Sequence, residues 1–275
     1  MIKYRSSSNE MVINIAGVSC RFSSQDTEFL NTLSYRYKPF LSTGKESFCI
    51  DVKTRGPKDS MHVFPDDPIV EVSSSCNSWS VRRLDIPFEA EIDLNKQRAT
   101  LSVTRSEYCF DSFLRILYSA LLVQDGGMLL HAASTKNENV ACIMFGVSGS
   151  GKTTLAKLSP DTVIGDEIVA VRKVKGKFYA FSTPFWGEFE GEKVNEKAKI
   201  RSAYLLKRDV RDFVKPIGSH RAMLEALTCS IFFGPEELTN LLLNTCLDLM
   251  IAVRVAELHF RPSVEVFDLL NEGVA

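Results

Sequence analysis

The sequence predicts an α/β (α+β) protein with a β-rich N-terminal half, residues 1–110, and a C-terminal α/β half, residues 111–275. Two observations predict this division. Up to residue 105, apolar, β-branched and aromatic residues alternate with polar ones in short runs, which is the period of strands. From residue 111 the period becomes helical, and helical and strand-like segments then alternate along the chain.

Short strands are expected throughout the first half. Polar or Gly/Pro-containing segments, such as residues 54–60 and 93–99, separate them. The alternation of apolar and polar residues predicts the strands but not their order in a sheet. The expected strands are residues 11–22, 46–54, 62–72, 79–94 and 98–105.

The second half is expected to begin with a helix over residues 111–127. Asp111 or Ser112 can cap its start, and Gly126-Gly127 can end it. One helical face carries an apolar stripe, which consists of Phe113, Leu114, Leu117, Leu121 and Leu122. The strands expected after it are 127–135, 140–145, 162–165, 168–174, 177–183, 199–208 and 251–262, and the helices are 152–158, 219–233, 236–249 and 263–273.

Composition excludes several classes of protein. The formal net charge of -1 gives no sign of a nucleic-acid partner. Seven cysteines, never spaced C-x-x-C, argue against a zinc ribbon or disulfide framework and favour a reducing compartment. No apolar run is typical of a signal peptide or membrane span. We expect a cytoplasmic protein without a membrane partner.

Residues 146–153, GVSGSGKT, match the phosphate-binding pattern G-x-x-x-x-G-K-[ST] without departure. An apolar strand-like run precedes them and a short helical segment follows, which is the context that the pattern requires. A chance Gly/Ser turn is the alternative. Because pattern and context agree, we expect a phosphate site.

Each residue type in this loop has a physical task. Glycines allow backbone angles that turn several N–H groups toward phosphate oxygens, and the following helix directs its positive end at them. Lys152 can reach the β- and γ-phosphates, and the Thr153 hydroxyl can bind a bridging Mg²⁺. ATP and Mg²⁺ are the expected ligands, and the predicted nucleotide-binding residues are Gly146, Val147, Ser148, Gly149, Ser150, Gly151, Lys152, Thr153 and Thr154.

An acidic pair, Asp166-Glu167, follows the loop closely. One short helix lies between, so the chain can return the pair to the loop. A carboxylate there can bind Mg²⁺ beside Thr153 or accept a proton from an attacking hydroxyl, and one acid serves one of these tasks at a time. Two solvated acids in a β-turn are the alternative. We predict catalysis by Asp166 and metal binding by Thr153, Asp166 and Glu167.

Three further features have a functional and a structural interpretation. His131 lies in an apolar strand and is either a core residue or a phosphate contact. The aromatic segment 182–193 favours a surface loop anchored by Phe185 and Trp186 over one that lines the acceptor or nucleotide site. Arg201 and Arg261 are typical of strand-end charges, although either could neutralise phosphate.

The order LLHAAS, GVSGSGKTTLAKL and VIGDEIVAV, within residues 128–171, resembles the HPr kinase/phosphorylase family, most of all its shorter relatives found beside peptide-modification genes. The resemblance implies the P-loop fold with a mixed sheet that this family shares with phosphoenolpyruvate carboxykinase. The glycine- and arginine-containing signature of the bifunctional enzymes has no counterpart here. The resemblance therefore does not extend to phosphorylase activity, HPr as substrate or hexameric assembly.

The resemblance also implies roles for single residues. Lys152 and Thr153 would hold the phosphates and Mg²⁺, and Asp166 would deprotonate an acceptor serine. Glu167 stands where the family usually has a second aspartate. His131 would lie near the transferred phosphoryl group, which adds it to Asp166 and Lys152 as a catalytic candidate.

These observations favour an ATP- and Mg²⁺-dependent kinase for a hydroxyl, with serine of a peptide or small protein as acceptor. Residues 1–110 would recognise that acceptor. A small-molecule phosphotransferase, a carboxykinase-like enzyme and a non-catalytic nucleotide-sensing module are the alternatives, and a homo-oligomer stays open.

Overall fold

The computed structural model describes residues 9–56, 70–75, 78–83 and 88–272. The chain divides into two compact units, residues 1–118 with 233–236 and residues 119–232 with 237–275. The division lies inside helix α2 (Glu107–Gln124). The boundary predicted between residues 110 and 111 falls earlier in the same helix.

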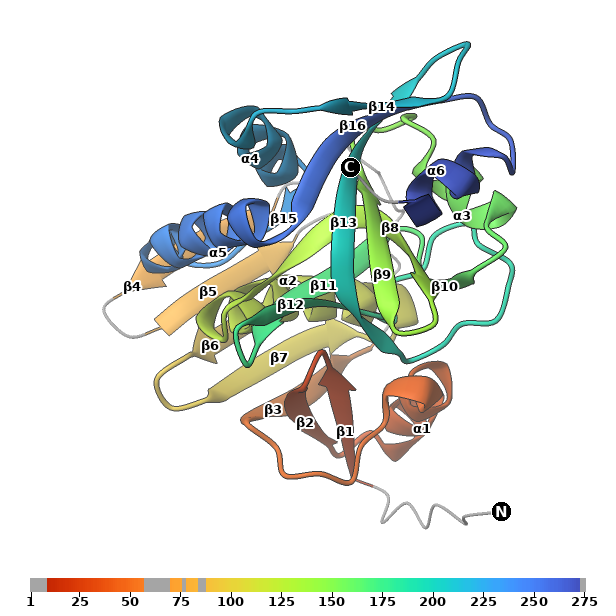
Figure 1. Ribbon diagram of the computed structural model, residues 1–275. Helices are drawn as coiled ribbons and strands as arrows, with labels where there is room; N and C mark the ends of the chain where they lie inside the picture. The colour runs from red at the N-terminus through yellow and green to blue at the C-terminus, as the bar shows by residue number, and fades with distance from the viewer. Residues whose placement is uncertain (1–8, 57–69, 76–77, 84–87, 273–275) are drawn as a thin grey trace. The chain divides into compact units, whose positions relative to one another are not determined.

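The first unit contains a seven-stranded mixed sheet (Figure 1). The pairs β2–β3 and β3–β7 are parallel, and the other neighbours are antiparallel. In sheet order the strands are β1 (Glu10–Ile15), β2 (Val18–Ser24), β3 (Phe48–Arg55), β7 (Arg98–Thr104), β6 (Phe88–Asp93), β5 (Ser78–Arg83) and β4 (Val70–Ser75). Of the predicted strand 62–72, residues 62–69 lie outside the described part, as do residues 84–87 of the predicted strand 79–94.

Helix α2 packs its first half into the core of this unit. The Phe110 ring meets Phe22 edge-on, with ring centroids 5.1 Å apart. Tyr118 is fully buried, and its hydroxyl donates to the carbonyl oxygens of Ile13 (2.9 Å) and Val18 (3.2 Å). The predicted helix is therefore present, and its apolar stripe is buried.

The predicted cap of this helix is wrong. The helix begins at Glu107, and the Phe110 amide already donates to the carbonyl oxygen of Ser106 (3.1 Å). Asp111 lies one turn inside the helix, where its carboxylate accepts hydrogen bonds from Arg36 (2.6 Å) and from the Tyr37 hydroxyl. Because Asp111 serves a tertiary contact and not the helix end, its position in the sequence was misleading.

Helix α1 (Thr27–Arg36), followed by the 3-10 turn η1 (Lys38–Phe40), was not predicted in this β-rich half. Asp26 caps α1, because its carboxylate accepts the amide of Phe29 at 3.1 Å. The same carboxylate accepts the Thr54 hydroxyl at 2.9 Å and binds the Arg105 guanidinium. Asp26 therefore joins the start of α1 to strand β3 and to the residue that follows β7.

We expect Asp26→Asn to lower the free energy of unfolding at pH 7 by about 1–2 kcal/mol. Hydrogen bonding from Arg105 lowers the pKa of Asp26 to about 2 from 3.8. The stabilisation is present above the unfolded-state pKa and is lost as pH falls through the folded one. Urea unfolding should therefore show the difference from wild type shrinking between pH 4 and 2.

Glu28→Gln is the matched control for that measurement. Glu28 binds the same Arg105 at 2.9 Å but is largely exposed, so its loss should cost less than about 0.5 kcal/mol. An equal loss from both variants would contradict a special role for Asp26.

The second unit contains a nine-stranded mixed sheet. The strands β9, β13 and β16 run parallel to one another, with β13 between the other two. Its strands are β8 (Gly127–Asn137), β9 (Val140–Phe145), β10 (Thr162–Gly165), β11 (Ile168–Val174), β12 (Lys177–Phe181), β13 (Lys197–Arg208), β14 (Phe213–Pro216), β15 (Ser230–Ile231) and β16 (Arg254–Phe260), and its helical segments are α3 (Lys152–Leu158), α4 (Ser219–Thr228), η2 (Glu236–Leu238), α5 (Thr239–Ala252) and α6 (Val266–Glu272).

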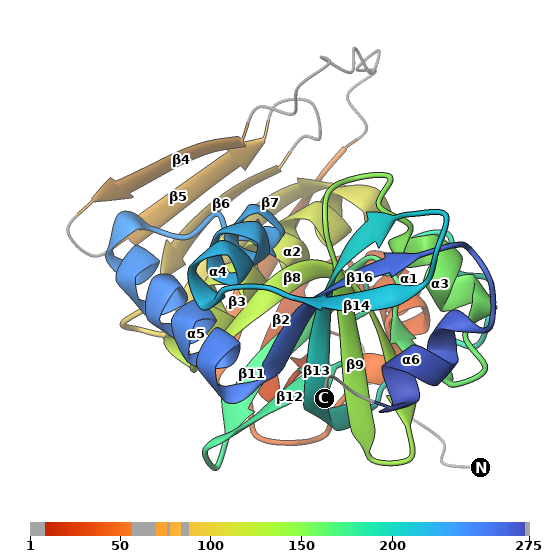
Figure 2. The same cartoon turned by 45° about the horizontal axis from the view of Figure 1, so that its top comes forward.

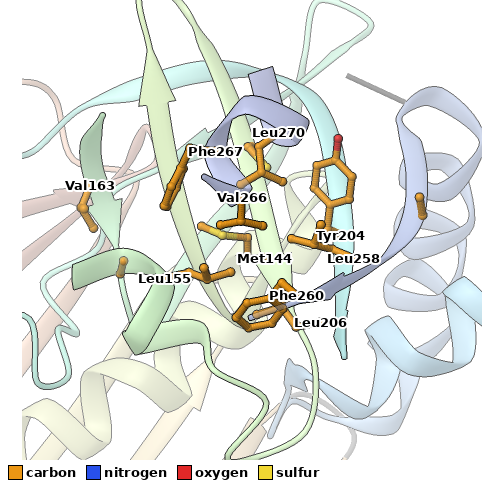
Figure 3. Close-up of a cluster of buried hydrophobic side chains, with 14 residues drawn as sticks. Met144, Leu155, Val163, Tyr204, Leu206, Leu258, Phe260, Val266, Phe267 and Leu270 are labelled. Atoms are coloured by element: carbon orange, nitrogen blue, oxygen red, sulfur yellow. The ribbon is translucent and has the colours of Figure 1, made fainter. Parts of the chain in front are cut away.

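Helices cover this sheet from both sides. Figures 1 and 2 show α3 and α6 together, across the sheet from the pair α4 and α5. Alternate residues of the parallel strands face α3 and α6, among them Met144, Tyr204 and Leu258, and they form one buried apolar cluster with Leu155 and Phe267 (Figure 3). The α/β fold with a mixed sheet is therefore confirmed.

Several elements differ from the prediction in this unit, among them the predicted helix 236–249, which is the 3-10 turn η2 followed by α5. Helix α4 ends at Thr228, and not at residue 233, because Ser230 and Ile231 pair with Leu130 and Leu129 as strand β15. Strand β14 was not predicted. None of the helices in the described ranges is both long and apolar enough to cross a membrane.

Candidate functional site

The loop 146–151 joins the buried strand β9 to helix α3, as predicted. Gly146, Gly149 and Gly151 have φ angles of 149°, 76° and 106°, which lie in the region that favours glycine. Val147, Ser148 and Gly149 are exposed, whereas Ser150 and Lys152 are buried. The loop thus has the backbone angles that an inward-facing row of amides needs.

Lys152 lies inside this loop. Its ammonium donates to the carbonyl oxygens of Gly146 (2.8 Å) and Val147 (3.2 Å). Burial lowers the pKa of Lys152, because a shielded ammonium loses hydration. The Ser150 hydroxyl is also buried but has no hydrogen-bond partner in the described structure. A buried ammonium and an unpaired hydroxyl within one loop fit an anionic ligand that would bind both.

Gly151 lies against the end of strand β16. A Cβ atom at this position would come within 2.7 Å of Cζ of Phe260, which is fully buried at the end of β16. Gly149 has open space around the same position. Glycine at 151 is therefore required by both its φ angle and the Phe260 ring.

We expect Gly151→Ala to lower the free energy of unfolding by about 2–4 kcal/mol, because strain and overpacking add. Gly149→Ala has only the strain and should cost about 1–2 kcal/mol. Chemical unfolding of the two variants measures both values. Equal losses would contradict the Phe260 contact as a constraint on the loop.

Strand β8 lies between the loop and the acidic pair. Ala132 pairs with Phe145, the last residue before the loop, while its amide donates to the Glu167 carbonyl oxygen at 3.0 Å on the other side. Two strand spacings, about 10 Å, therefore separate the backbones of Phe145 and Glu167. This is within the span of a triphosphate with its metal and two side chains.

His131 is adjacent to Ala132 in this strand and pairs with Ile168. Its side chain is exposed, so the interpretation as a core histidine is wrong. The backbone amide of His131 donates to the carbonyl oxygen of Cys229 at 2.7 Å. The strand thus presents an imidazole at the edge where the loop begins.

Asp166 is 1% exposed, which excludes the alternative of two solvated turn residues. Its two carboxylate oxygens accept the amides of Gly187 (2.8 Å) and Phe189 (2.9 Å). A carboxylate has about four acceptor positions, so two remain after these bonds. Segment 187–189 therefore orients Asp166 while leaving it capacity to bind a proton or metal.

Segment 185–189 also packs beside the helix that follows the loop. Trp186 stacks on Phe189 with ring centroids 5.8 Å apart, and both rings pack on the cluster that contains Leu155 of α3. Glu188 lies 3.7 Å from the ammonium of Lys157 on α3. The predicted aromatic anchoring is present, and the segment has a second task that the sequence did not reveal, which is to hold Asp166.

Thr153 and Glu167 are the other two predicted metal ligands. Thr153 and Glu167 are half-buried, and the Thr153 hydroxyl has no partner within the ranges that the structure describes. A hydroxyl and two carboxylates are oxygen donors of the kind that Mg²⁺ prefers. Among the described residues, no three His, Cys, Asp or Glu side chains gather as a metal cluster. Thr154, the last predicted loop residue, is half-buried at the start of α3.

The two arginines considered from the sequence have structural partners. Arg201 donates to the carbonyl oxygen of Leu270 at 2.7 Å. Arg261 binds the Asp212 carboxylate through Nη2 (2.9 Å) and Nε (3.2 Å). These contacts do not bring either guanidinium to the loop, and they give both arginines a structural role.

Comparison with known proteins supports the resemblance seen in the sequence. A family model described as phosphoenolpyruvate carboxykinase matches residues 54–182, which include the loop and the acidic pair. Because the matched residues make up less than half of the chain, the match supports a distant relationship to phosphoenolpyruvate carboxykinase. It also supports an ATP-using enzyme in general terms.

Among solved structures, the chain is similar to the HPr(Ser) kinase/phosphatase from Coxiella burnetii, with 10% sequence identity and a TM-score of 0.28. The similarity covers 52% of this chain and 91% of that one. No curated protein matches the sequence.

Proposed function

We propose that the protein is an ATP- and Mg²⁺-dependent kinase that transfers the γ-phosphoryl group to a hydroxyl, with serine of a peptide or small protein as acceptor. The observation that carries the proposal is a buried Asp166 on one side of β8 and an intact GVSGSGKT loop on the other. Residues 1–110 would recognise the acceptor, in the cytoplasm.

Phosphate binding rests on the loop itself. The amides between Gly146 and Thr153 would bind phosphate oxygens, and the Lys152 ammonium would exchange its two carbonyl partners for β- and γ-phosphate oxygens. Because the ammonium is already buried, its interaction with an anion is stronger than it would be in water.

Phosphoryl transfer requires a base and an orientation. The acceptor oxygen would attack the γ-phosphorus while its proton passes to the free lone pairs of the Asp166 carboxylate. The bond to the β,γ-bridging oxygen would break, and ADP would leave with that electron pair. His131 would lie near the transferred group, and Gly187 and Phe189 would keep the carboxylate in one orientation.

Magnesium would be held by Thr153 with an acid of the pair. Proton acceptance and Mg²⁺ binding each require a carboxylate. Asp166 would perform one of these tasks, and Glu167 would supply the second carboxylate. When bound, Mg²⁺ would neutralise charge on the β- and γ-phosphates.

The central test compares wild type with Lys152→Ala and Asp166→Asn. We expect Lys152→Ala to weaken ATP binding roughly 10- to 100-fold, because a charge-assisted contact is lost. Asp166→Asn should retain ATP binding but lower transfer at least about 100-fold. Titration calorimetry gives the affinities, and transfer of labelled phosphate to serine-containing peptides gives the rate.

Asp161→Asn is the matched control, since the Asp161 carboxylate accepts a hydrogen bond from Asn137 at 2.8 Å, which an asparagine side chain can also accept. It should leave both quantities unchanged. If the wild type binds ATP with Mg²⁺ but phosphorylates no hydroxyl offered, the kinase proposal fails.

We also expect Gly187→Ala to lower transfer about 10- to 100-fold with little effect on ATP affinity. A Cβ atom at 187 would come within 2.9 Å of Oδ2 of Asp166, and misplacing a reacting group is costly. Gly218→Ala, which has open space, is the control. Unchanged transfer in Gly187→Ala would contradict the orienting role of this segment.

A carboxykinase-like reaction is the second candidate, because the matching family model carries that name. It would need basic side chains directed at an organic acid. Arg261 is bound to Asp212, and Arg221 is bound to Glu257 at 2.8 Å, so these charges are already compensated. Thermal shifts with organic acids but not with peptides would favour this candidate. ATP binding without turnover would favour a nucleotide-sensing module instead.

A further inference from the structure

The parallel strands β9, β13 and β16 end at the same edge of the sheet as the phosphate loop. Leu205 of β13 pairs with Phe145, and Arg208, at the end of β13, pairs with Phe260. The Leu206 carbonyl oxygen lies 3.5 Å from the position of a Cβ atom on Gly146. The end of β13 therefore runs alongside the loop.

Arg208 meets the far end of that loop. Its Nε atom lies 3.7 Å from the position that a Cβ atom would take on Gly151, the residue before Lys152 and Thr153. The ammonium of Lys152, in contrast, is bound at the loop's beginning, to Gly146 and Val147. One cation thus stands at each end of the loop.

Arg208 is exposed and makes no ion pair or side-chain hydrogen bond within residues 9–56, 70–75, 78–83 and 88–272. Its neighbours at this edge differ, because Arg261 is held by Asp212 and Arg221 by Glu257. A guanidinium without a carboxylate partner, next to a phosphate loop, keeps all five N–H donors for an anion.

We propose that Arg208 is a catalytic residue that binds the γ-phosphoryl group of ATP during transfer, an inference that rests on the proposed kinase function. Its planar fork donates to two oxygens of that group at once. As the acceptor oxygen bonds to the γ-phosphorus and the bond to the bridging oxygen breaks, charge spreads over these oxygens. Arg208 neutralises it from the side opposite to Lys152.

A contact to the γ-phosphoryl group distinguishes ATP from ADP. In Arg208→Ala we expect ATP affinity to fall roughly 10- to 100-fold and ADP affinity to change less than about twofold, by titration calorimetry with Mg²⁺. Slow hydrolysis of ATP, which requires no acceptor, should fall about 100-fold. Arg208→Lys keeps the charge but not the fork, and should recover part of the ATP affinity.

Arg211→Ala is the matched control. Arg211 is exposed in the same segment, and no contact with another described residue brings its side chain to the loop. It should leave both affinities unchanged. Equal weakening of ATP and ADP in Arg208→Ala, or a matching loss in Arg211→Ala, would overturn the assignment, as would unchanged ATP affinity.

Nucleotide binding by the wild type distinguishes an error in the proposed kinase function from an error in the role of Arg208. If the wild type binds neither nucleotide, the proposed function is wrong and the assignment of Arg208 falls with it. If the wild type binds and hydrolyses ATP and Arg208→Ala does the same, only the assignment of Arg208 is wrong.

Discussion

Hydrogen bonding of strand β8 on both edges is the constraint on which the candidate site depends. Ala132 pairs with Phe145 on one edge and binds the Glu167 carbonyl oxygen on the other. Strands β10 and β11 both run along that second edge, so the acidic pair is a short interruption between two paired segments. Sheet geometry, which depends little on side-chain identity, thus fixes the spacing between the loop and the acids.

Two buried charges in this site are compensated by dipoles. Lys152 is solvated by two carbonyl oxygens and Asp166 by two amides. Burying an ion without such partners would cost several kcal/mol. Because neither charge is bound to the other within the described residues, each can meet a ligand without first breaking an ion pair. The Asp166 carboxylate is therefore oriented before substrate arrives, whereas the Lys152 ammonium exchanges its two carbonyl partners for the ligand.

The local elements of the second unit were largely predictable, and the long-range ones were not. The motif fixed the loop and the helix Lys152–Leu158, because glycine spacing and helix start depend on neighbouring residues. Asp111 was misassigned as a cap because an acid near a helix start looks the same whether it binds an amide or Arg36. Helix α4 was predicted too long because the pairing of Ser230 with Leu130 is distant in sequence.

In the candidate site, too, the residues of local motifs were predictable and those brought in by long-range pairing were not. The side chains of Lys152, Thr153 and Asp166 could be named from spacing, but the amides of Gly187 and Phe189 that hold Asp166 carry no residue-type signal. Arg208 was missed for a related reason. A charged residue at a strand end is common, and only the pairing of β13 with β9 and β16 brings this one to the loop.

The contact of Gly151 with Phe260 limits how these two positions can vary in evolution. A smaller residue at 260 would relieve the crowding but not the φ angle of 106°, so position 151 would stay glycine. Position 260 has more freedom, at the expense of a void in the cluster of Figure 3. Substitutions at this edge of the sheet are therefore tolerated at position 260 but not at position 151.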